Sequence, residues 1–187
     1  MTETQKAPDP AADAPAEAVD LPWADVQPEH HRMLRLAPLK TDRATGGRPL
    51  RFVEFGYAER NNHQRSLLRL SIALPGQKVR KEQNHLDVWV DHELRRVHFR
   101  PDTGLQVEPM NRGIGRFLAA QGITWAKRKW SSYSFDAMDL SNKDALVEDT
   151  RLRRDHFLRV QGFDVVYADA QHLKGSVREG KVGDLLG

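Results

Sequence analysis

The sequence predicts an α+β (mixed α/β) fold, in which an antiparallel meander is followed by strand, helix, strand, helix and strand. Between residues 51 and 108, apolar and polar residues alternate with a period of two, which is typical of half-buried strands. After residue 110 the apolar residues recur at helical spacing, and turn signals such as Pro75-Gly76 separate the elements. A run of strands followed by helices is the layout of this fold class.

The first 30 residues differ in composition from the rest of the chain. Residues 1–30 hold seven acidic residues and one lysine, a balance of −6, whereas residues 31–187 hold 28 basic and 19 acidic residues, a balance of +9. The first segment is rich in Pro and Ala and too poor in apolar residues to form a core, so we interpret it as a disordered tail. Residues 31–187 are long enough for one domain with its own core.

Composition also excludes several classes of protein. The chain has no cysteine, which excludes disulfides, thiolate nucleophiles and cysteine-ligated zinc. Its apolar runs are only a few residues long, and no basic segment precedes an apolar one near the N-terminus, so we expect a cytoplasmic protein with no membrane partner. The eight histidines lack a ligand spacing with carboxylate support, so we expect no metal.

The meander is predicted from four stretches. Residues 52–57 form a strand, and residues 68–74 form a second one that ends at Pro75-Gly76. Residues 86–90 and 94–99 form a hairpin around the three-residue loop 91–93, and a turn at 101–104 leads to a short strand at 105–107.

Longer elements follow residue 110. Apolar spacing predicts a helix over 113–129, in which Gly122 either weakens the helix or marks a close approach. A strand is expected at 133–138, then a helix over 143–161 with Ser141 as its N-cap and Gly162 just past its end. Residues 163–167 form a last strand.

The stretch LQVEPMNRGIGRFL at 105–118 carries the chemistry. A short strand enters a turn with two glycines and opens a helix, whose first N–H groups lack partners within the helix. Gly113 and Gly115 have no Cβ, so an anion can approach the backbone, and Arg112 and Arg116 add positive charge. The pattern predicts a diphosphate site.

This stretch resembles the acetyl-CoA-binding motif of the GNAT superfamily of N-acetyltransferases. The sequence HFLRVQGF at 156–163 is similar to the later helix of that family, which ends in Gly-Phe before a strand. The resemblance implies acetyl-CoA or another acyl-CoA as co-substrate, and a backbone after 105–107 that holds the pantetheine arm. It assigns the cofactor-binding residues Val107, Asn111, Arg112, Gly113, Ile114, Gly115 and Arg116. Met110 departs from the motif's usual Arg or Gln, and the family's pair of helices is not evident between 35 and 66.

The same resemblance implies that an amine, on a small molecule or a protein, attacks the thioester directly. A base must take the ammonium proton, and Glu54 and Glu108 are the candidates. Leu158 stands where many members carry a Tyr that protonates the departing thiolate, so the acid is sought among Tyr133, Ser131 and Ser132.

An alternative function is a binding or regulatory module of the same fold without catalysis, which contacts nucleic acid or a protein partner. Basic clusters at 127–129 and at Arg151, Arg153 and Arg154 suit phosphates of either kind, with nucleic acid as the second choice. The apolar pair Leu185-Leu186 after a Gly-rich stretch reads as an element cut short, which predicts that the native chain continues past Gly187.

Overall fold

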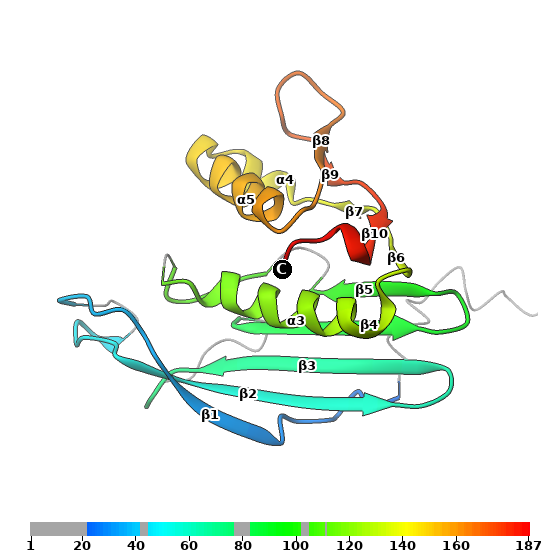
Figure 1. Cartoon of the computed structure of the whole chain (residues 1–187). Helices are drawn as coiled ribbons and strands as arrows, with labels where there is room; N and C mark the ends of the chain where they lie inside the picture. Colours follow the sequence, from blue (N-terminus) through cyan, green and yellow to red (C-terminus); the bar gives the residue numbers. More distant parts are fainter. Residues whose placement is uncertain (1–21, 42–44, 77–82, 102–104, 111) are drawn as a thin grey trace, which may run out of the picture.

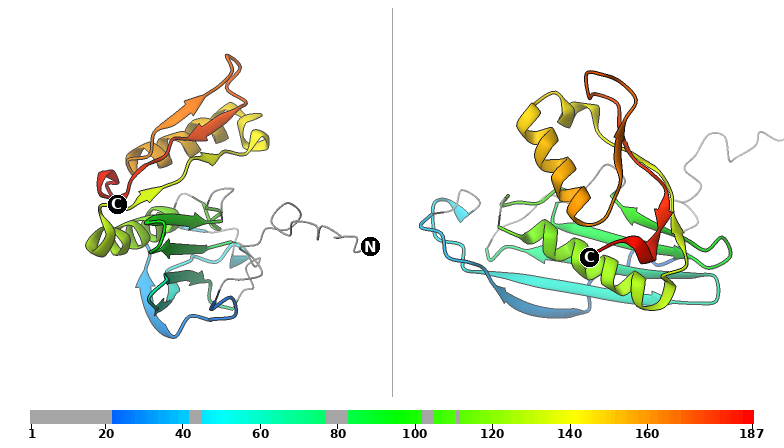
Figure 2. Two further views of the ribbon diagram at one scale, coloured as in Figure 1. Left: turned by 90° about the vertical axis from the view of Figure 1, so that its right-hand side faces the viewer. Right: turned by 45° about the horizontal axis from the view of Figure 1, so that its top comes forward.

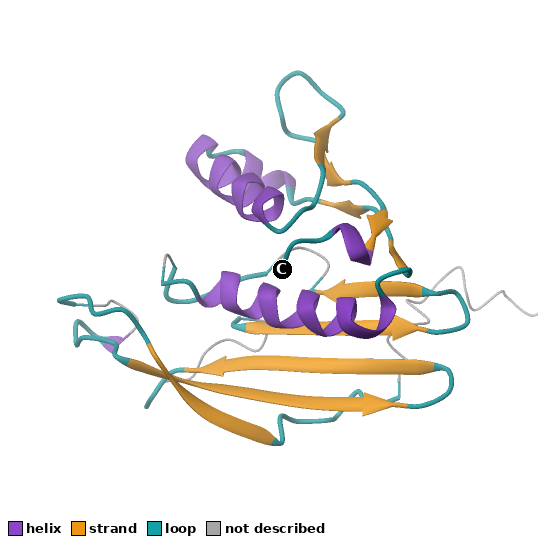
Figure 3. Cartoon of the chain, viewed as in Figure 1, coloured by secondary structure: helices purple, strands orange, loops and turns teal. Residues whose placement is uncertain are grey.

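The computed structural model describes residues 22–41, 45–76, 83–101, 105–110 and 112–187. They form a seven-stranded sheet in the order β1-β2-β3-β4-β5-β6-β10 and a three-stranded sheet in the order β7-β9-β8 (Figure 1). A mostly antiparallel sheet with separate helices confirms the predicted α+β class (Figure 3). The predicted turn at 102–104, Asn111 and residues 1–21 of the acidic tail lie outside the described residues.

The elements follow one another along the chain with short connections. They are β1 (His30–Arg35), β2 (Phe52–Asn61), β3 (Arg65–Ala73), β4 (His85–Asp91), β5 (Arg96–Arg100), α3 (Ile114–Trp130), β6 (Ser134–Phe135), β7 (Met138–Asp139), α4 (Asn142–Ala145), α5 (Glu148–Val160), β8 (Val165–Tyr167), β9 (Gly175–Val177), β10 (Gly180–Lys181) and the 3-10 turn η2 (Val182–Asp184).

Strands β2 to β5 confirm the predicted meander, with one correction at the last hairpin. Its loop has four residues, because the Asp91 carboxylate accepts the N–H groups of Glu93 and Leu94, both at 3.0 Å, and Arg95 takes a positive φ of 54°. Leu94, expected to face inward on a strand, is therefore 70% exposed in the loop. The predicted strand at 105–107 is reduced to a single bridge from Gln106 to Gln83.

Helix α3 confirms the prediction for 113–129 and packs across one face of the main sheet, which we call the front face. Leu118 and Ile123 of α3 are buried there with the inward residues of β3 and β4. At Gly122 a Cβ would lie only 2.9 Å from Val88 Cγ2, so the glycine marks a close approach of helix and sheet.

The opposite face, which we call the back face, is covered in part by residues 22–29. Trp23 stacks on Trp89 of β4 with ring centroids 6.4 Å apart. Buried Arg69 donates from Nη1 to the carbonyls of Trp23, Ala24 and Val26 at 3.1, 3.2 and 2.7 Å. Strand β3 is therefore buried on both faces and not half-buried as its alternation predicted. Residues 22–30, assigned to the tail from composition, include this cover and the start of β1.

The second half of the chain also differs from prediction. The strand expected at 133–138 is divided between β6 in the main sheet and β7 in the small one. The helix expected over 143–161 is two helices, because Val147 is extended at φ −111° and ψ 117°. Ser141 caps α4, as expected, and Gly162 ends α5 at φ +96°. The small sheet lies with α4 and α5 beyond β5 and β6 (Figure 2).

Candidate ligand-binding site at the start of α3

The chain before α3 is held by a buried asparagine. Asn84, which is fully buried, donates from Nδ2 to the carbonyl of Glu108 and accepts the Glu108 N–H at Oδ1, both at 2.8 Å. Its own N–H donates to Gln106 at 2.8 Å. These three hydrogen bonds fix residues 106–108 beside the start of β4 and so determine where α3 begins.

Gly113 and Gly115 have different surroundings. Gly113 precedes α3 with φ +80°, has open space where a Cβ would stand, and provides no side chain to cap the helix. This leaves the first N–H groups of α3 without a side-chain cap. A Cβ on Gly115 would instead lie 3.5 Å from Val107 and 3.7 Å from Phe157, so Gly115 faces packed side chains. Of the two glycines predicted to admit a phosphate, only Gly113 leaves room for one.

The two predicted arginines also divide their roles. Arg112 donates from Nη2 to the carbonyls of Ala37 and Leu50 at 2.7 and 2.9 Å, which ties the start of α3 to the connection between β1 and β2. Arg116 is exposed on the first turn of α3. Arg112 therefore shapes the site, and Arg116 is the cation of the predicted motif that faces solvent.

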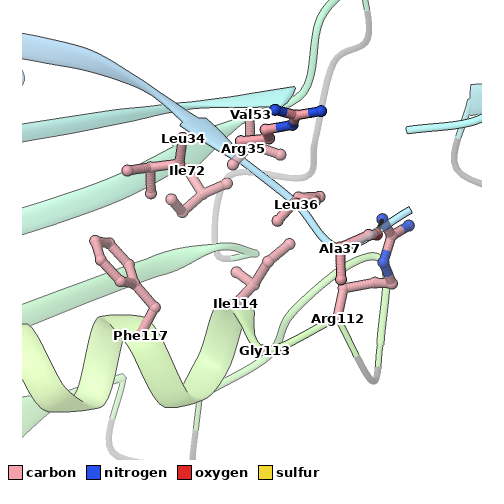
Figure 4. A pocket seen from close by; sticks show the side chains of 10 residues that line it. All are labelled: Leu34, Arg35, Leu36, Ala37, Val53, Ile72, Arg112, Gly113, Ile114 and Phe117. Atoms are coloured by element: carbon pink, nitrogen blue, oxygen red, sulfur yellow. Dashed lines mark hydrogen bonds between the residues drawn. The ribbon is translucent and has the colours of Figure 1, made fainter. Parts of the chain in front are cut away.

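A pocket opens beside Gly113, between α3 and strands β1 to β3 (Figure 4). It encloses about 270 Å³, slightly below the ~300–1,000 Å³ usual for small-molecule sites, so it suits part of a ligand. Its walls are mostly apolar, with arginines at one end. The lining residues are Leu34, Arg35, Leu36, Ala37, Val53, Ile72, Arg112, Gly113, Ile114 and Phe117.

The candidate acid and base residues are not brought together. Glu54 is exposed on the back face and lies 3.1 Å from His31 Nδ1, whereas the pocket is on the front face. Tyr133, with Ser131 and Ser132, follows the far end of α3, which is about 25 Å long at 1.5 Å per residue. Glu108 is the one candidate beside the start of α3. Leu158 packs against the core.

A second expected feature, the place for a pantetheine arm, is filled. Strands β5 and β6 run parallel for two residue pairs and then separate. Where they separate, the rings of Phe99, Phe135 and Phe163 meet with centroids 5.3, 5.8 and 6.4 Å apart. A ligand inserted between these strands would have to displace three packed rings, so the pocket toward β1 to β3 is the more accessible place.

The basic clusters considered for nucleic acid are largely used within the protein. Lys127 donates to the carbonyl of Leu185 at 2.6 Å, and Lys129 lies 3.6 Å from Glu59. Arg154 donates to Ser141 and to the buried Asp155. Trp125 and Trp130, considered for base stacking, pack edge to face against each other at 4.9 Å. Fewer cations and rings therefore remain free for phosphates and bases.

Sequence reasoning missed the β1 wall of the pocket. Arg32, Leu34 and Leu36 alternate with a period of two in the sequence, and this was the available signal. It also missed a polar chain at the far end of α3, where His92 bonds buried Ser66 at 2.8 Å and Tyr133 at 3.1 Å. Ser66 is 1% exposed and sits in the middle of packed strands, so this chain stabilises the end of the helix.

Comparison of the chain with protein-family models, with curated proteins and with solved structures found no match. Within the described ranges, no group of three or more His, Asp and Glu side chains is placed to hold a metal ion. None of the helices in those ranges combines the length and apolar character needed to cross a bilayer. The site is therefore assessed on its own geometry, as an apolar pocket beside an uncapped helix start.

Proposed function

We propose that the protein binds an acyl-CoA at the start of α3. The observation that carries the proposal is the pocket of Figure 4, an apolar cavity that opens beside Gly113 and the uncapped first turn of the helix. A ligand that matches both parts has an apolar chain and an anionic group. Acyl-CoA has these parts, and the stretch 105–118 resembles a motif that binds it.

The two parts of the ligand would meet different chemistry. The acyl chain would lie against Leu34, Ile114 and Phe117, since burying apolar surface is worth about 25 cal/mol per Å². A phosphate would accept hydrogen bonds from the first N–H groups of α3 and face the Arg116 guanidinium. Because the rings between β5 and β6 are packed, we place the acyl group in the pocket and not between those strands.

Isothermal titration with acetyl-CoA, octanoyl-CoA and free CoA tests this proposal. We expect octanoyl-CoA to bind more tightly than acetyl-CoA, because each additional buried CH₂ adds about 0.8 kcal/mol until the pocket is full. Leu34→Trp should fill the pocket and remove the preference for the longer chain, while Leu94→Trp, at an exposed loop position, should retain it. Absence of binding by all three ligands at millimolar concentration would refute the proposal.

Transfer of the acyl group to an amine is the second candidate function, and the position of Glu108 favours it. Glu108 is held beside the start of α3 by Asn84, whereas Glu54 and Tyr133 lie elsewhere. In this reaction the amine attacks the thioester carbon, the C–S bond breaks, and CoA leaves. Glu108 would accept the ammonium proton, and water would protonate the thiolate, because Leu158 has no proton to give.

Release of free CoA in the presence of a panel of amines tests the transfer step. We expect Glu108→Gln to lower the rate about 10²-fold or more without weakening acyl-CoA binding. Glu54→Gln, on the other face of the sheet, is the matched control and should leave the rate unchanged. If acyl-CoA binds but no amine releases CoA, the protein is a binding module and not a transferase.

A further inference from the structure

Strand β1 forms one edge of the seven-stranded sheet, and no described residue pairs with its outer side. Leu36 donates its N–H to Arg51, the residue opposite it in the β1–β2 register. Hydrogen-bonded pairs alternate in an antiparallel ladder, so the N–H and C=O groups of His31, Met33 and Arg35 point away from β2. Six backbone hydrogen-bonding groups are therefore available along this edge.

The side chains of β1 define what this edge would bind. Arg32 and Arg35 are exposed, and no carboxylate of the described residues lies within ion-pair distance of either. His31 already faces Glu54 at 3.1 Å. Next to these charges are two apolar side chains, Met33 at 57% exposure and Phe52 at 45%. The edge thus combines backbone groups, two uncompensated guanidinium groups and an exposed apolar pair.

We propose that β1 binds an extended acidic segment of a partner protein, which adds to the main sheet as a further strand. Strand addition satisfies the outward backbone groups, while side chains at alternate positions provide selectivity. Acidic residues of the partner would face Arg32 and Arg35, and an apolar residue would cover Met33 and Phe52. Pairing of β1 with β1 of a second copy would bring four arginines onto one ribbon, so charge complementarity favours a different chain.

Fluorescence anisotropy with a labelled peptide, Gly-Glu-Val-Glu-Leu-Glu-Val-Glu-Gly, tests the proposal without any CoA present, so its outcome does not depend on the proposed function. The decisive variant is Met33→Pro. It removes an N–H that points away from β2, and proline is tolerated at such edge positions. We expect this variant to weaken peptide binding about tenfold or more, because it removes one hydrogen bond and obstructs its neighbours.

Two controls keep the result interpretable. Met33→Ala retains the N–H and should bind the peptide within about threefold of the wild type if the backbone provides most of the affinity. The double variant Arg32→Glu with Arg35→Glu should lose most of the binding whether or not Met33→Pro folds, and a peptide with Gln in place of Glu should bind weakly to the wild type.

The proposal is overturned if the wild type does not bind the acidic peptide at millimolar concentration, or if folded Met33→Pro binds it as well as Met33→Ala does. Analytical ultracentrifugation adds a separate test. A concentration-dependent dimer of the wild type that Met33→Pro abolishes would identify the occupant as a second copy and would also overturn the proposal.

Discussion

The two faces of the main sheet are covered by different means. On the front face, α3 presents apolar side chains such as Leu118 and Ile123 to an apolar surface. On the back face, residues 22–29 have little apolar surface to offer, and they are held by the buried Arg69 with its partner Asp87 and by the Trp23–Trp89 stack. Burial of β3 on both faces thus depends on packing on one side and on a charge network on the other.

The difference has a consequence for how each face responds to change. Apolar packing is insensitive to pH and lost in proportion to the volume removed. A buried ion pair depends on both partners, because removing one leaves the other charged and desolvated. Variants on the two faces should therefore differ in the size and in the pH dependence of their effects, and four measurements can test this.

The largest effect is expected on the back face. Arg69→Met keeps much of the side-chain volume but removes the donors to Asp87 and to three carbonyls, so we expect a loss of about 3–5 kcal/mol in the free energy of unfolding. Urea denaturation followed by tryptophan fluorescence measures it. Arg65→Met on the same strand is the control, and equal losses in the two variants would contradict this account of the back face.

Leu118→Ala tests the front face. Leu118 is fully buried under the sheet, and its truncation should cost about 3 kcal/mol through lost transfer energy and a residual cavity. Leu94→Ala, at an exposed loop position, should change stability by less than about 0.5 kcal/mol. A loss at Leu118 no greater than that at Leu94 would mean that α3 does not pack as described.

The pH dependence separates the faces most directly. Burial raises the pKa of Asp87, but hydrogen bonds from His85 and Arg69 outweigh it, and the net pKa lies below the ordinary value. The ionised carboxylate therefore contributes stability at pH values above the unfolded pKa of about 3.9, and the contribution is lost as pH falls through the lower folded pKa. We expect the free energy of unfolding of Asp87→Asn to fall less steeply with acid than that of the wild type.

Leu118→Ala provides the comparison across the sheet in the same pH series. Its curve should run parallel to that of the wild type, because no titrating group is changed. Glu29 and Asp169, whose pKa values are also lowered by hydrogen bonds, contribute equally to every variant. Identical slopes for Asp87→Asn and Leu118→Ala would show that the back-face pair does not control the acid response.

The smallest effect is expected where the front face carries polar groups. Tyr133→Phe removes the hydroxyl that bonds His92 at 3.1 Å, and we expect a loss of about 1 kcal/mol. Tyr57→Phe is the matched control, since no described group hydrogen-bonds its hydroxyl. Thermal unfolding of the two variants measures the difference, and a larger loss at Tyr57 would remove the structural role given to this polar chain.

Sequence periodicity predicted the elements whose burial is local. The alternation in β2 to β4 and the helical spacing of α3 appear directly in the order of residues. It did not predict that β3 is buried on both faces, because the cover over Arg69 comes from residues 22–29, more than 40 positions earlier. It also did not predict the separation of α4 from α5, where Leu146 and Val147 read as helical apolar residues but lie exposed at the break.

The candidate site was predicted in part. The uncapped start of α3 and its glycines follow from a local motif, so the sequence indicated the right segment. Pairing Glu54 or Tyr133 with that segment required knowledge of strand facing and of helix length, and the structure separates all three. The pocket wall from β1 depends on a long connection between β1 and β2, fixed by Arg112 through two backbone carbonyls, and no local pattern encodes that contact.

The contacts of Arg69 also affect how the protein is made. Residues 22–29 leave the ribosome early, but the groups that hold them, Arg69 and Asp87, are synthesised about 40 to 60 residues later. At roughly 5–20 residues per second, the cover waits about 3–12 seconds for Asp87. During that interval Trp23 and its neighbours are open to other chains and to chaperones, so variants at Arg69 should lower the yield of folded protein in cells by more than their equilibrium stability implies.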